Sequence, residues 1–64
     1  METGKVLIYL KNKNRGLATI TGTIDTVLLH DVDFELNTGD EIVFDVVRVE
    51  AGLLAKDVAI HTLD

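Results

Sequence analysis

Residues 15–30 read RGLATITGTIDTVLLH, and this stretch decides the fold class of the chain. It holds two short runs rich in leucine, isoleucine, valine and threonine, which are residue types that favour β-strands. Gly22, flanked by two threonines, separates the runs as a turn residue. Because strand side chains alternate between two faces, the runs predict strands at about 17–21 and 25–30. The alternation places Ala18 with Ile20 on one face, and Val27 with Leu29 on one face.

The strand pattern continues on both sides of this stretch. The segment at about 5–10 holds an unbroken apolar run, which predicts a strand with apolar side chains on both faces. The clearest alternation in the chain lies at about 42–47, and a further run at about 54–61 predicts a last strand. Gly39 and Gly52 mark the turns that precede these two strands.

Five short strands in one small chain predict an all-β protein with a closed barrel, which leaves no exposed sheet edge. A five-stranded antiparallel OB-fold barrel is the commonest arrangement of this size. An SH3-like barrel is the alternative, and periodicity alone leaves it open.

The composition is that of one small globular domain, expected to cover residues 1–64. The chain has no cysteine, so a hydrophobic core must stabilise it, and 47% of its residues are hydrophobic. Its longest apolar run, Val6–Leu10, is too short to cross a bilayer, and no signal-peptide pattern precedes it. These features predict a cytoplasmic protein that is not associated with a membrane.

Charge is distributed unevenly along the chain, whose net charge is −5. Residues 1–16 contain four lysines or arginines and one carboxylate, a net charge of +3. Residues 17–64 contain two basic residues and ten carboxylates, a net charge of −8. The total argues against indiscriminate binding of polyanions, whereas the basic end is a weak signal for a nucleic-acid site.

Several pieces of the chain resemble motifs of the cold-shock domain family. Residues 15–20, RGLATI, resemble its first nucleic-acid-binding motif, Lys-Gly-Phe-Gly-Phe-Ile, and residues 27–30, VLLH, resemble the start of its second, Val-Phe-Val-His-Phe. Further pieces follow in the family's order: Gly4-Lys5-Val6, then Gly39 with Ile42 and Phe44, then Gly52 with Ala55, Asp57 and Val58. The resemblance covers nearly the whole chain, and it implies an OB barrel that binds single-stranded DNA or RNA without catalysis.

The ligand face departs from the family pattern. Leu17 and Thr19 stand where the first motif has phenylalanines, and Leu28 and Asp31 stand where the second has aromatic rings, although His30 is kept. Because stacking on an aromatic ring contributes roughly 1–3 kcal/mol per base, these replacements predict weak binding.

The resemblance nevertheless implies a set of contact residues. Lys11, Lys13 and Arg15 would contact phosphates, and Tyr9 and His30 would contact bases. The complete set of candidate nucleic-acid-binding residues is Tyr9, Lys11, Lys13, Arg15, Leu17, Thr19, Leu28 and His30.

A second interpretation uses the same face differently. Leu7, Ile8, Leu17 and Leu28 are expected to form an exposed apolar surface, with Val43 nearby. Sizeable apolar surfaces usually mark interaction sites. The alternative function is therefore an OB-fold interaction module that docks a protein partner or a second copy of the chain.

Metal binding and catalysis are not expected. The segment 30–33, HDVD, has only one histidine, and on a continuous strand His30 and Asp31 point in opposite directions. His61 near Asp64 offers at most a terminal ion pair. No phosphate-binding loop and no nucleophile–base pair is present, so we expect no enzyme activity and no cofactor.

Overall fold

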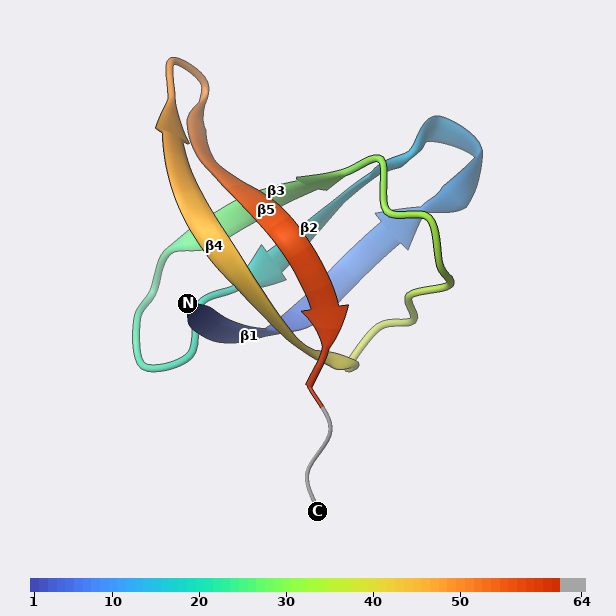
Figure 1. Cartoon of the computed structure of the whole chain (residues 1–64), viewed down its shortest axis with the longest axis horizontal. Coiled ribbons are helices and arrows are strands. Elements are labelled where there is room, and N and C mark those ends of the chain that lie inside the picture. Colours follow the sequence, from blue (N-terminus) through green and yellow to red (C-terminus); the bar gives the residue numbers. More distant parts are fainter. Residues whose placement is uncertain (62–64) are drawn as a thin grey trace.

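Five strands close into a barrel in the computed structural model, which describes residues 1–61 (Figure 1). The strands are β1 (Glu2–Leu10), β2 (Arg15–Thr19), β3 (Thr26–His30), β4 (Glu41–Val49) and β5 (Gly52–Ile60). One turn of 3₁₀ helix, η1 (Lys11–Lys13), connects β1 to β2. In this described part of the chain no helix has the length and apolar character needed to cross a membrane.

The order of strands round the barrel is β1-β2-β3-β5-β4, with β4 returning to β1. The chain is thus an all-β protein with a five-stranded OB-like barrel, as the sequence predicted. Four strand pairs are antiparallel, but β3 and β5 run parallel and meet at the single residue pair Leu28↔Leu54. One pair in such a barrel must be parallel, because strand directions cannot alternate all the way round a ring of five.

β1 begins earlier than the predicted strand at 5–10, because its first residues join a second partner. Residues from Glu2 to Lys5 pair with β4, and the residues from Val6 onward pair with β2, with a bulge between Val6 and Ile8. Pairing between segments so far apart along the chain leaves no local sequence signal, so the start of this strand could not be predicted.

Two glycines allow β1 and β2 to approach closely. A Cβ atom on Gly16 would lie 2.6 Å from Cδ1 of Tyr9 and would also overlap the carbonyl oxygen of Ile8. A Cβ atom on Gly4 would overlap the carbonyl oxygen of Thr19. The tight radius of the barrel at this point therefore depends on the absence of two side chains.

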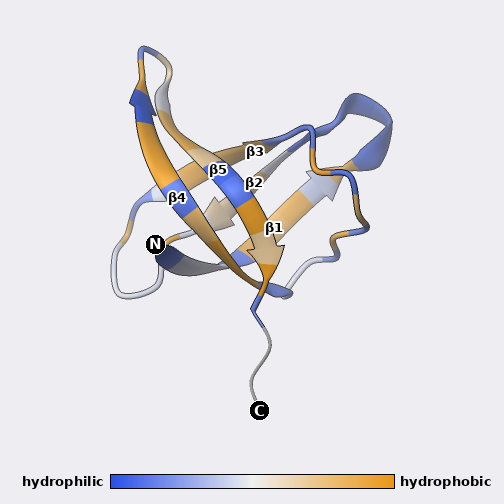
Figure 2. Cartoon of the chain, viewed as in Figure 1, coloured by the Kyte–Doolittle hydropathy of each residue, from blue (hydrophilic) through white to orange (hydrophobic). Residues whose placement is uncertain are grey.

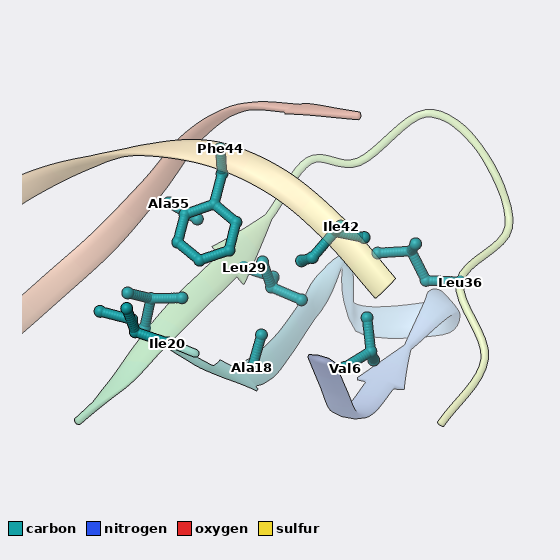
Figure 3. Packing of buried hydrophobic residues seen from close by; sticks show 9 residues of the cluster. Val6, Ala18, Ile20, Leu29, Leu36, Ile42, Phe44 and Ala55 are labelled. Carbon is teal, nitrogen blue, oxygen red and sulfur yellow. The ribbon is translucent and has the colours of Figure 1, made fainter. Parts of the chain in front are cut away.

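The core fills the barrel with aliphatic side chains packed around Phe44 (Figure 3). Every strand contributes, as the predicted alternation requires, and Leu36 enters from the loop that connects β3 to β4. The buried residues are Val6, Ala18, Ile20, Val27, Leu29, Leu36, Ile42, Phe44 and Ala55. The faces predicted for residues 17–21 and 25–30 are confirmed: Ala18, Ile20, Val27 and Leu29 point inward.

Candidate nucleic-acid interface

A groove of about 550 Å³ follows the seam between β3 and β5 on the outside of the barrel. One end lies at the loop between β1 and β2, and the other lies at the turn of the β4–β5 hairpin. Its lining residues are Lys13, Asn14, Arg15, Leu28, Leu29, His30, Asp31, Ala51 and Leu54. The faces of strands 2 and 3, together with these two loops, are where OB folds bind oligonucleotides and oligosaccharides.

The basic end of the groove is built by the loop after β1, which is hydrophilic throughout (Figure 2). Asn14 ends η1 in the left-handed conformation, with φ of 51°, and its carbonyl oxygen accepts a hydrogen bond from the Asp31 N–H. These contacts place Lys13 and Arg15 at the mouth of the groove. Neither cation forms an ion pair with a carboxylate of residues 1–61, so both charges are available to an anionic ligand.

Apolar side chains cross the outer face beside this basic end. Ile8 pairs with Leu17, Leu17 with Leu28, and Leu28 with Leu54. Directly paired residues share a face of the sheet, so these four form a continuous row over β1, β2, β3 and β5. The exposed fractions of Ile8, Leu17 and Leu28 are 46%, 37% and 38%, which confirms the predicted exposure of these residues.

His30 pairs with Arg15 across β3 and β2, and both residues line the groove. The His30 ring forms a hydrogen bond with the next residue, Asp31. Nδ1 of His30 lies 2.8 Å from Oδ2 of Asp31. The prediction that these two side chains point in opposite directions is wrong, because β3 ends at His30 and Asp31 has φ of 53°. Strand alternation stops where the backbone enters the left-handed region.

Half of the predicted contact residues line the groove, and half do not. Lys13, Arg15, Leu28 and His30 are brought together there, and Leu17 lies beside Leu28 in the apolar row. The remaining predicted residues, Tyr9, Lys11 and Thr19, lie apart from the groove lining.

Tyr9 and Thr19 are engaged in interactions within the barrel. The Tyr9 ring is half-buried against the core, and its Oη accepts a hydrogen bond from the Val32 N–H at 3.1 Å. The Thr19 hydroxyl donates to the Lys5 carbonyl oxygen and accepts from the Lys5 N–H. Tyr9 therefore anchors the loop that follows β3, while Thr19 joins β2 to β1.

A smaller hollow of about 310 Å³ adjoins the groove between the loop after β3 and the middle of β5. The two hollows share His30 and Asp31, so this pair forms the ridge between them. Phe34 and Lys56 also line the smaller hollow, but Phe34 is half-buried against the core.

The part of the chain that the structure describes contains no group of three or more metal-capable side chains. Nδ1 of His61 lies 3.8 Å from Oε2 of Glu41, a partner that the sequence did not suggest. The predicted pairing of His61 with Asp64 falls outside the described residues.

Five residues that line the groove were not among the predicted contact residues, namely Asn14, Leu29, Asp31, Ala51 and Leu54. Leu54 and Ala51 belong to the site only because β5 lies beside β3, and no local pattern indicates that parallel contact. The sequence did indicate a turn at Asn14, since asparagine before a strand commonly adopts a positive φ.

Comparison with known proteins gives no further guide: no family model matches this chain, and no curated protein matches it.

Proposed function

We propose that the protein is a weak, non-catalytic binder of single-stranded RNA or DNA, with the groove between β3 and β5 as its site. The observation that carries this proposal is the placement of two cations that form no ion pair within residues 1–61, Lys13 and Arg15, beside Leu28 and His30 in one groove. The groove occupies the ligand-binding region of OB folds. The cold-shock resemblance of the same residues supports the same function.

The chemistry of the groove limits its affinity. Among the described residues, its lining contains no phenylalanine, tyrosine or tryptophan, and the His30 ring is the one aromatic platform there, so most of the roughly 1–3 kcal/mol that each stacked base contributes is missing. Leu28 and Leu54 offer apolar contacts without a π-face. Binding then depends strongly on phosphate contacts, and two or three such contacts predict a roughly tenfold loss of affinity between about 50 and 200 mM salt.

The test is fluorescence anisotropy of labelled oligo-dT and oligo-U with the wild type and two matched variants. Arg15→Gln removes a cation from the groove, and Arg48→Gln makes the same change on β4, where Arg48 lines a different hollow. Arg15→Gln should weaken binding by about three- to tenfold and reduce the slope of log K against log salt by about 0.7. Arg48→Gln should leave both quantities close to wild type.

Equal effects of the two arginine variants would assign the binding to net charge rather than to the groove. Absence of binding to either oligonucleotide at low salt would remove the nucleic-acid function.

The apolar row favours a second candidate function, docking of a protein partner. Ile8, Leu17 and Leu28 each expose more than a third of their surface, and they are contiguous. Exposed apolar surfaces of this kind mark interaction sites when they are large enough.

Salt tolerance separates this second function from the first. Protein docking through the row should survive high salt and should be lost in Leu17→Asp or Leu28→Asp, as measured by sedimentation velocity or a pull-down. Ile60→Asp is the control, because Ile60 is 46% exposed on β5 and pairs with Ile42 rather than with the row. Loss of docking in all three variants would show a general effect of the added charge.

A further inference from the structure

We propose that Asp31 is a specificity-determining residue that fixes the protonation pattern of His30 and so makes His30 a reader of N–H groups on unpaired bases. This inference rests on the proposed nucleic-acid function and deepens it. It concerns a residue at which the chain departs from the aromatic pattern of the motif that it resembles.

The argument begins with the short contact between the two side chains. Nδ1 of His30 and Oδ2 of Asp31 are 2.8 Å apart. An ionised carboxylate has no proton to donate and can only accept, so the hydrogen must lie on Nδ1 of the imidazole. In the neutral ring the other nitrogen, Nε2, then carries no proton and is an acceptor.

The groove around the His30 ring determines which ligand groups its Nε2 acceptor can bind. His30 lines the groove together with Arg15 and Lys13, whose side chains carry donors and no acceptor. Within residues 1–61, Nε2 of His30 has no hydrogen-bond partner. When the His30 ring is neutral, the wall of the groove thus combines two phosphate-directed cations with one acceptor, Nε2, which suits an N–H on the edge of a base.

Asp31 is well suited to hold this arrangement. Its φ of 53° interrupts the strand alternation, so its carboxylate lies beside the His30 ring. Its backbone N–H donates a hydrogen bond to the Asn14 carbonyl oxygen, which holds the backbone in place. Glycine adopts such a φ without strain, so Asp31→Gly removes the carboxylate while keeping the backbone. Asp33→Gly is the matched control, because it removes the same charge from the same loop and keeps the Asp31 carboxylate that is bonded to His30.

The first measurement uses the free protein. Long-range nitrogen–proton NMR correlations of the His30 ring, recorded at about pH 8 where histidine side chains are ordinarily neutral, report which nitrogen carries the proton. We expect Nδ1–H in the wild type and in Asp33→Gly, and a shift of population toward Nε2–H in Asp31→Gly. A wild-type ring protonated mainly on Nε2 overturns the proposal.

The second measurement uses two oligonucleotides of about eight nucleotides, a length within the range of OB-fold sites. One is oligothymidylate, and the other carries N3-methylthymine, in which a methyl group replaces the N3–H donor on the base edge. The wild type should prefer the unmodified oligomer by about three- to tenfold, the range expected for one neutral hydrogen bond. The preference should fall toward one in Asp31→Gly and persist in Asp33→Gly.

If the wild type and Asp31→Gly prefer the unmodified oligomer equally, Asp31 does not determine which bases His30 binds, and the proposal is overturned. Failure of both oligomers to bind removes the nucleic-acid function and the reading role with it, whereas the nitrogen correlations still decide the position of the proton.

Discussion

Gly16 lies where β2 passes against the ring of Tyr9, and its missing side chain is a condition for that contact. We expect Gly16→Ala to destabilise the protein by about 2–3 kcal/mol, because the added methyl group overpacks backbone and ring together. Urea denaturation measures the change. Gly22→Ala is the comparison, since its Cβ would meet no atom within 4 Å and only its φ of 84° is unfavourable, a cost of about 1 kcal/mol. Equal losses in the two variants would contradict the packing argument.

Tyr9 anchors the loop after β3 through one hydrogen bond, from the Val32 N–H to its Oη. Tyr9→Phe should cost about 1 kcal/mol of unfolding free energy and should speed amide hydrogen exchange at Val32. Thr38→Val removes a different bond between the same loop and β1, the one to the Leu7 carbonyl oxygen, and should leave exchange at Val32 unchanged. Unaltered exchange at Val32 in Tyr9→Phe would show that the hydroxyl does not hold the loop.

Individual residues were predictable where the strand was regular. The inward positions of Val27 and Leu29 and the outward positions of Leu28 and His30 follow from a period of two. Asp31 was not predictable in this way, because its orientation depends on a change of backbone region at the end of the strand.

β3 offers a direct test of strand alternation, because two neighbouring leucines lie on opposite faces. Leu29 is 1% exposed in the core, whereas Leu28 is 38% exposed on the outer face. Leu29→Ala should cost about 2–4 kcal/mol, and Leu28→Ala should cost less than about 1 kcal/mol. Chemical denaturation of both variants compares the two costs. Similar costs would mean that the register of β3 differs from the one described.

The existence of the strands was easier to predict than their boundaries or their pairing. All five strands were identified, because each holds an apolar or alternating run long enough to carry a signal. β2 ends at Thr19 rather than two residues later, because the turn that joins it to β3 begins at Ile20, whose carbonyl oxygen accepts a hydrogen bond from the Thr23 N–H. The parallel contact between β3 and β5, which creates the groove, required the whole barrel to be known.

The molecule as a whole combines an acidic body with a basic end, and within residues 1–61 few of the charges are paired. The ion pairs among residues 1–61 involve the amino terminus, His30 and His61, and none involves a lysine or an arginine side chain. Salt should therefore act in opposite directions on stability and on binding. It screens repulsion within a chain of net charge −5, and it also screens attraction between phosphates and the basic end.

Raising salt from about 20 to about 300 mM should increase the midpoint of thermal unfolding by about 2–5 °C. The same change should weaken oligonucleotide binding. Circular dichroism melts and anisotropy in the same buffers measure the two effects, and a fall in the unfolding midpoint with salt would contradict the repulsion argument.

The division of the barrel into two parts has a kinetic consequence. The β1–β2–β3 meander and the β4–β5 hairpin each pair strands that are neighbours in sequence, and the loop of residues 31–40 joins them (Figure 1). The contacts that unite the two parts, β1 with β4 and β3 with β5, link segments far apart along the chain. Non-local pairing is the slow part of folding, so ring closure should set the rate at which this protein folds. Doubling the length of the connecting loop would then raise the free energy of closure by only about 0.6 kcal/mol.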